Sequence, residues 1–365
     1  MFSVIISIIA VILVVFILIG VHEAGHFVTA RLCGIKVLRF SLGFGKPIFQ
    51  FSDKHGTEYV LSVLPLGGYV ELLDEHGQQA VPSDQVHLSF NRQVFWKRFI
   101  VIAAGPVFNL LLAIVLFWGV FLVGFKVPIP VIGEIIPGSP AAKAQMTAQQ
   151  IITSVDHNDV SDWRAVVFEL IEHIGNNDAV QLTTQTYPDR QDTKKVEIDL
   201  HDWKIDPLKP DILQSLGIVP QPPQQDGYVM VKKSIFPAGV AALQETWLYI
   251  DLNVLTLYKV IVGKISLQSL GGPITIFQGA IVSFNQGLVN YLSFMAIVSI
   301  ILAIVNVIPI PGLDGAQMLY LLIEKFRGKP LSLEVQALIF RLGMIAIALL
   351  FVLVIINDVK RLTMV

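Results

Sequence analysis

The sequence predicts a polytopic α-helical membrane protein with four spans, a β-region after the first span and one small water-soluble domain after the second. Hydrophobic residues make up 54% of the 365 residues and charged residues only 15%, which is outside the range of ordinary soluble domains. Mean hydropathy is +0.66. Four apolar stretches are long enough to cross the roughly 30 Å hydrocarbon core of a bilayer as helices.

The composition also excludes some partners and sites. A net charge of −2 is too small to indicate a nucleic-acid partner, so none is expected. Cys33 is the single cysteine, which excludes an intramolecular disulfide and a cysteine zinc cluster. Any zinc ion must therefore be bound by His, Asp or Glu.

The first helix is expected over residues 1–33, and it contains the motif His22-Glu23-Ala24-Gly25-His26. The run from Phe2 to Val21 carries no charge, and at 1.5 Å per residue it places His22 about 30 Å from Phe2, near the far membrane face. Residues four apart lie on one helix face, so His22 and His26 can bind one Zn²⁺. The Glu23 side chain can reach a water on that metal.

Residues 34–94 are expected to form a membrane-associated β-region and a loop on the side of the motif. Short strands and turns are predicted, with the stretch 59–64 ended by Pro65, Gly67 and Gly68 before 69–73. Its apolar side chains are expected to touch the bilayer or line the site. The polar stretch 74–91 is predicted to be an exposed loop.

The second span is expected over residues 95–125. Gly105 and Pro106 interrupt it, and small residues in a span favour close helix packing. Asn109 needs a polar partner in a membrane, so it serves either packing or the site.

The remaining chain divides into three regions. Residues 126–223 have mixed charges and form the water-soluble domain, with a helix near 163–174 and strands near 179–186 and 195–200. Residues 224–288 are expected to form interfacial helices and a loop, broken at 271–273, and 217–236 to join them to the domain. Residues 289–365 contain the third and fourth spans, separated by a charged loop at 324–329.

Charge distribution predicts the orientation of the spans. Basic residues concentrate in the loops after the first and third spans, which the positive-inside rule places in the cytoplasm. Both termini and the soluble domain are then extracytoplasmic, and the His22 end of the first span faces the cytoplasm. Asp314, which directly follows the third span, lies on the same side.

Asp314 is the candidate for a third zinc ligand, because two histidines leave a catalytic zinc site one protein ligand short. A carboxylate at membrane depth is costly and is therefore a candidate functional group. The alternatives are a helix N-cap and a simple interfacial aspartate.

Two motifs together resemble the signatures of the site-2 protease family of intramembrane zinc proteases. They are His22-Glu23-Ala24-Gly25-His26 and the stretch from Asn306 to Gly315, which reads NVIPIPGLDG. Stretches at 39–45, 65–70, 103–106 and 272–274 are similar to a bacterial subgroup of that family. The similarity covers essentially the whole chain.

The resemblance implies roles for the matching residues. His22, His26 and Asp314 would bind one Zn²⁺ per chain, and Glu23 would be the general base. The β-region would pair with an unwound substrate by strand addition. Candidates for contact with the substrate or the oxyanion are Asn306, Gly43, Phe44, Gly45, Gly67 and Gly68, and candidates for structural or substrate-gating roles are Gly105, Pro106, Asn109, Gly272 and Pro273.

The start of the soluble domain, residues 132–142, resembles the opening of a bacterial PDZ domain. It departs from that pattern at Gln145-Met146 and Gln149-Gln150, which bears on peptide binding. The subgroup typically carries two such domains in tandem, whereas this chain has room for one PDZ-like domain. The resemblance places this domain in the periplasm, where a partner or the C-terminus of a cleaved product would bind.

The function implied is a zinc-dependent intramembrane endopeptidase of the bacterial inner membrane. It would cleave single-span membrane proteins within or near the bilayer after a prior extracytoplasmic cut. Anti-sigma-factor-like proteins of an envelope stress response and remnant signal peptides are the substrate classes implied. Two alternatives are a non-catalytic PDZ-bearing membrane scaffold and a metal transporter.

Overall fold

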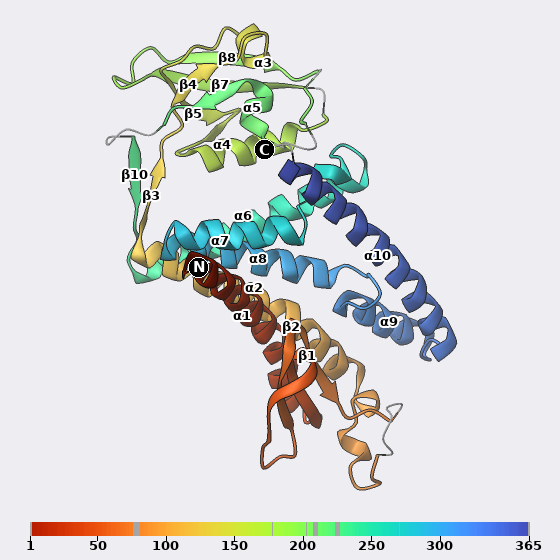
Figure 1. Cartoon of the computed structure of the whole chain (residues 1–365). Coiled ribbons are helices and arrows are strands. Elements are labelled where there is room, and N and C mark those ends of the chain that lie inside the picture. Colours follow the sequence, from red (N-terminus) through yellow and green to blue (C-terminus); the bar gives the residue numbers. More distant parts are fainter. Residues whose placement is uncertain are drawn as a thin grey trace. The chain divides into compact units, whose positions relative to one another are not determined.

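The computed structural model describes residues 2–75, 81–176, 178–201, 203–206, 211–222, 227–269 and 271–363 (Figure 1). Four helices in it are long and apolar enough to cross a membrane, at Ile6–Leu32, Phe95–Val123, Leu288–Val307 and Glu334–Lys360, which confirms a long apolar helix at each of the four predicted positions. The chain forms two compact units. Unit 1 comprises Met1–Gly119, Gly239–Ile250 and Ile276–Phe351, and unit 2 comprises Val120–Ala238, Asp251–Thr275 and Val352–Val365.

In unit 1, helix α1 (Phe2–Leu32) packs against helix α8 (Leu288–Val307). Ala10 and Val14 of α1 share a buried cluster with Tyr291 and Met295 of α8. The Tyr291 hydroxyl donates a hydrogen bond to the backbone carbonyl of Ala10 at 2.6 Å. A buried tyrosine hydroxyl needs such a partner, so this contact fixes the register of α8 along α1.

Strands β1 (Val37–Ser52) and β2 (Glu58–Leu72) form a folded two-stranded sheet beside α1. Residues 39–42 of β1 pair with two stretches of β2, 58–61 and 68–71. The prediction that a strand ends at Pro65 was wrong, because β2 continues through Gly67 and Gly68. Register shifts along the pair let the strand bend there without ending.

The loop predicted at 74–91 is only partly exposed. Two short 3₁₀ helices, Val86–Leu88 and Phe90–Arg92, pack back onto the β-region. The Phe90 backbone N–H donates to the Leu73 carbonyl at 2.7 Å, and Ser89 is fully buried. The prediction of an exposed loop was therefore wrong for this half, and residues 76–80 lie outside the described part.

Helix α9 (Asp314–Arg327) occupies part of the segment predicted as a charged loop at 324–329. The helix ends at Gly328, which adopts the left-handed conformation typical of a helix C-terminus. Arg98 of α2 (Phe95–Val123) forms two hydrogen bonds with the Glu324 carboxylate, at 2.6 and 3.1 Å. The ion pair between Arg98 and Glu324 therefore joins α9 to α2.

Unit 2 contains the segment predicted to be the soluble domain. Its main sheet has the order β6-β5-β7-β8, from β5 (Gln150–Val155), β6 (Asn158–Asp159), β7 (Ala179–Thr186) and β8 (Lys194–Asp199). A second pair joins β4 (Ile132–Ile135) to β9 (Ile218–Pro220), and the helices are α3 (Pro140–Lys143), α4 (Trp163–His173) and α5 (Ile212–Leu216). The predicted helix near 163–174 and the strands near 179–186 and 195–200 are confirmed.

The chain enters and leaves this domain through a two-stranded ribbon. Strand β3 (Phe125–Pro128) pairs antiparallel with β10 (Tyr228–Val231). The segment 217–236, expected to be a join, therefore contains strands β9 and β10. Helices α6 (Ile235–Ile261) and α7 (Pro273–Asn285) follow, with the 3₁₀ helix Leu267–Ser269 between them, and α10 (Leu333–Thr363) ends the chain.

Replacing Leu182 by alanine should destabilise the soluble domain, because this side chain is fully buried in its core beside Leu170 and Ile152. The expected loss is about 2–5 kcal/mol of unfolding free energy. Urea unfolding of the whole protein in detergent, followed by hydrogen exchange of peptides from β5 and β7, measures it. Thr186→Ala, at an exposed position of the same strand, is the matched control and should leave the exchange midpoint unchanged.

Candidate metal centre

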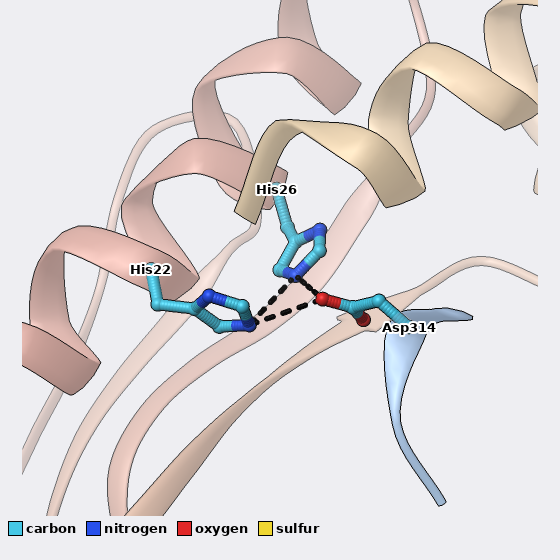
Figure 2. Close-up of side chains that lie close together, drawn as sticks. All are labelled: His22, His26 and Asp314. Atoms are coloured by element: carbon cyan, nitrogen blue, oxygen red, sulfur yellow. Dashed lines mark hydrogen bonds and ion pairs between the residues drawn. The ribbon is translucent and has the colours of Figure 1, made fainter. Parts of the chain in front are cut away.

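Two histidines of α1 and one aspartate of α9 converge on a single point (Figure 2). The Nε2 atoms of His22 and His26, one helical turn apart, lie 3.4 Å from each other. The Oδ2 atom of Asp314 lies 3.1 Å from Nε2 of His22 and 3.3 Å from Nε2 of His26. The three atoms thus form a nearly equilateral triangle.

This triangle has the dimensions of one face of a tetrahedral zinc site. Zinc bonds of about 2.0–2.1 Å to nitrogen or oxygen separate neighbouring ligand atoms by roughly 3.3 Å. The Asp314 Oδ2 atom is buried and has no hydrogen-bond partner in the described part of the chain. A buried carboxylate oxygen in that position needs a cation, so the donor set fits zinc.

The backbone of α2 fixes the orientation of His26. Its Nδ1 atom lies 2.8 Å from the carbonyl oxygen of Val101. A carbonyl can only accept, so Nδ1 carries the proton and donates it. In neutral His26 the Nε2 atom then presents its lone pair to the triangle, as a metal ligand must.

The Asp314 side chain does not cap α9. Leu313 is the N-cap residue, its side chain makes no capping hydrogen bond, and Asp314 is the first residue of the helix. The N-cap alternative is therefore not supported.

Two glycines allow backbones to approach the site closely. A Cβ atom at Gly105 of α2 would collide with the imidazole rings of both His22 and His26. A Cβ atom at Gly68 of β2 would lie 2.8 Å from Cγ of Glu23. Helix α2 therefore covers the histidines from one side, and β2 lies directly against Glu23.

The same residues line a cavity of about 490 Å³. Its wall includes His22, Glu23 and His26 of α1, Asp314 of α9, and the stretch of β2 from Gly68 to Val70. Glu23 is 9% exposed, so its carboxyl has limited access to solvent. The cavity therefore brings the candidate metal ligands, one further carboxyl group and a strand into a common space.

Of the other residues predicted to contact the substrate or the oxyanion, some line this cavity and others do not. Asn306 lines it, and its Nδ2 atom donates to the Leu302 carbonyl of the same helix at 3.0 Å. Gly43, Phe44 and Gly45 lie in β1, where the Phe44 ring stacks on Tyr69, and they are not among the residues that line the cavity.

The residues predicted to have structural or substrate-gating roles also lie in different parts of the structure. Gly105, as described above, packs on the histidine rings, and Pro106 follows it within α2. Asn109 contacts His22, with its Nδ2 atom 3.2 Å from Nδ1. Gly272 and Pro273 belong to unit 2, where the Gly272 N–H donates to Asp358 of α10 at 3.0 Å.

Sequence reasoning missed the contact between the Val101 carbonyl and His26. A backbone carbonyl carries no residue-specific signal in the sequence. The ion pair between Arg98 and Glu324 was also not predicted, because Glu324 was expected to lie in a charged loop at 324–329.

Comparison with known proteins shows similarity along nearly the whole chain. The sequence model of peptidase family M50 matches residues 10–351. The regulator of sigma-E protease RseP of Salmonella typhimurium is 34% identical over 454 aligned positions, with 99% of this chain and 100% of the relative covered. The protein of the same name from Escherichia coli is 34% identical over 437 positions, covering 95% and 96%. A candidate zinc metalloprotease of Vibrio cholerae is 32% identical over 446 positions, covering 97% and 98%.

Gly105→Ala should weaken zinc binding, because the new methyl group would push the two histidine rings apart. Overpacking of this kind costs about 1–3 kcal/mol, which corresponds to roughly 5- to 150-fold in affinity. Competition with a chromophoric chelator measures the affinity. Gly119→Ala in the same helix is the control, because a Cβ atom there meets nothing within 4 Å. Equal zinc affinities of the two variants would show that α2 does not press on the histidines.

Proposed function

Because the chain belongs to peptidase family M50 and is a zinc metalloprotease of the site-2 type, we propose that it cleaves single-span membrane proteins within or near the bilayer. One observation carries this proposal. The candidate zinc ligands, the Glu23 carboxyl and one side of strand β2 all line the same cavity.

We assign His22, His26 and Asp314 as the ligands of one zinc ion per chain. Three protein ligands leave one tetrahedral position open, which is the arrangement of a catalytic rather than a structural zinc site. When bound, zinc supplies Lewis-acid chemistry, acidifying water and polarising a peptide carbonyl.

Glu23 is the general base in this proposal. It neighbours His22 in the sequence and lines the cavity, so its carboxylate can accept a proton from the attacking water. The same carboxyl then donates this proton to the departing amide nitrogen. Asn306, on the wall of the same cavity, is positioned to bind the substrate backbone or the developing oxyanion.

Strand β2 supplies a place for an extended substrate. Residues 68–71 pair with β1 on one side, and within the described part of the chain no strand pairs with their other side. Gly68, Tyr69 and Val70 also line the cavity. A helical substrate keeps its carbonyls in internal hydrogen bonds, so it must unwind before cleavage, and this edge can pair with the unwound segment.

The soluble domain of unit 2 is proposed to be a single periplasmic PDZ-like domain that screens substrates or binds peptide ends. The alignment with the Salmonella relative has 454 positions, whereas this chain has 365 residues, so at least 89 positions lie opposite gaps in this chain. That difference is the size of one small domain. A single domain is expected to admit a broader set of substrates than a tandem pair.

The location and the substrates follow from the charges and the relatives. We place the chain in a bacterial inner membrane, with basic loops and the active site toward the cytoplasm and both termini in the periplasm. Two of the relatives are named as regulators of sigma-E protease. Anti-sigma-factor-like proteins that have already been cut outside the membrane, and remnant signal peptides, are therefore the proposed substrates.

Glu23→Gln should abolish cleavage while zinc remains bound, because the amide cannot accept the proton of the attacking water. A loss of about 10²- to 10⁴-fold is expected. The assay uses the purified protein in proteoliposomes with a single-span model substrate, and zinc is determined by mass spectrometry. Glu134→Gln, an exposed position of the soluble domain, is the control. Unchanged cleavage by Glu23→Gln would refute this mechanism. Retention of zinc by His22→Phe would refute the ligand assignment.

The need for unwinding predicts a dependence on the helix stability of the substrate. Replacing one interior alanine of the model span by glycine, close to the cleavage position, lowers helix stability by about 1 kcal/mol, or roughly fivefold in the unwound population. The cleavage rate should rise by a similar factor. A set of spans with glycine placed near to or far from the cleaved bond provides the comparison. Equal rates for both positions would contradict binding of an unwound segment.

A further inference from the structure

We propose that Asn109 is a positioning residue that holds His22 in the tautomer and ring orientation needed to bind zinc. The proposal rests on the proposed function only in assigning His22 as a ligand. It gives a role in the metal site to a membrane-embedded asparagine that packing alone does not explain.

The two ring nitrogens of His22 face different partners. The Nε2 atom lies 3.1 Å from Asp314 Oδ2, within the triangle of candidate ligand atoms. The Nδ1 atom points the other way, toward α2, where Nδ2 of Asn109 lies at 3.2 Å. Asn109 is thus the residue that contacts the ring on the side away from the metal position.

Metal binding decides which tautomer His22 must adopt. Zinc takes the lone pair of Nε2, so a neutral His22 carries its proton on Nδ1. Nδ1 is then a donor and requires an acceptor. The Asn109 Oδ1 atom is buried and has no hydrogen-bond partner among the described residues. A 180° rotation of the amide, which exchanges oxygen and nitrogen with little change in shape, places Oδ1 opposite the Nδ1 proton.

Asn109 is held firmly enough for this role. Its side chain is fully buried, and the Ser299 hydroxyl of α8 donates to its backbone carbonyl at 2.8 Å. The contacts from His22 to Asn109 and from Ser299 to Asn109 connect α1, α2 and α8 in unit 1. The Asn109 amide group can therefore rotate about its Cβ–Cγ bond while α2 keeps its position.

A role limited to helix packing fits these contacts less well. A buried amide is costly unless its polar atoms are satisfied, and a packing asparagine would bind a neighbouring helix through both of them. Here, among the described residues, the side-chain amide makes its polar contact with His22, a candidate metal ligand. His26 receives the equivalent support from the Val101 carbonyl, so Asn109 completes a matched pair of supports.

Zinc affinity of the purified full chain in detergent tests the proposal. Asn109→Leu removes the acceptor and keeps a similar volume, so the affinity should fall about 10- to 100-fold. Asn109→Asp restores an acceptor and should recover most of that loss. Replacing zinc by Co²⁺ adds a second measurement, because the visible spectrum of cobalt reports the ligand geometry and should change for Asn109→Leu alone. Asn290→Leu, the same change at an exposed position of α8, is the control.

Two outcomes would overturn the proposal. Asn109→Leu could bind zinc with wild-type affinity and an unchanged cobalt spectrum, or Asn109→Asp could be as defective as Asn109→Leu, which indicates packing alone. If Asn109→Leu does not fold, ¹⁵N NMR of histidine-labelled wild-type protein decides. A protonated, hydrogen-bonded Nδ1 on zinc-bound His22 supports the proposal, and an unprotonated Nδ1 contradicts it.

These readouts do not depend on proteolysis, so the two proposals can fail separately. If His22→Phe retains zinc, the ligand assignment of the proposed function is wrong. If His22→Phe loses zinc and Asn109→Leu does not, only the role of Asn109 is wrong.

Discussion

The structure depends on one constraint: three electron-pair donors must meet at a single point within a unit built from membrane helices. His22 and His26 supply two of the three donors, because their four-residue spacing places both on one face of α1. Asp314 must be brought from the far end of the chain, on α9. The bidentate contact between Arg98 and Glu324 joins α9 to the start of α2, and α2 lies against the histidines. This ion pair, nearly three helical turns along α9 from Asp314, is one contact that holds the helix carrying the carboxylate against α2.

A second requirement follows from the proposed cleavage of substrates within or near the bilayer. A peptide bond inside a bilayer is normally hidden in a helix, and exposing its polar groups to hydrocarbon costs several kcal/mol for each group. A site that cleaves such a bond must offer replacement hydrogen bonds at the place where it offers the metal. The edge of β2 at Gly68 to Val70 lies on the wall of the cavity that contains Glu23 and Asp314. In the proposed function, strand β2 and the candidate metal centre therefore act together on one substrate segment.

Features that depend on local spacing were predicted from the sequence, and features that depend on distant contacts were not. The lengths of the apolar runs and the four-residue spacing of His22 and His26 are local, so the spans and the histidine pair could be predicted. Strand β2 continues past Pro65 because pairing with β1 on both of its halves compensates for the bends. Only the last turn of α9, residues 324–327, was predicted as a charged loop, because the pairing of Glu324 with Arg98 is recognisable only when both helices are placed. The Val101 carbonyl gives no sequence signal at all.

Helix α2 determines the geometry of the metal site although it supplies none of the proposed ligands. Val101, Gly105 and Asn109 are four residues apart, so they lie on one face of α2. The Val101 carbonyl accepts a hydrogen bond from His26, Gly105 leaves room for both imidazole rings, and Asn109 contacts His22. A slip of α2 by one residue along α1 would move all three by about 1.5 Å and misplace both imidazoles together. The metal centre is consequently sensitive to the register of two spans, and contacts that fix this register, such as Ser299 with Asn109, belong to the site as much as its ligands do.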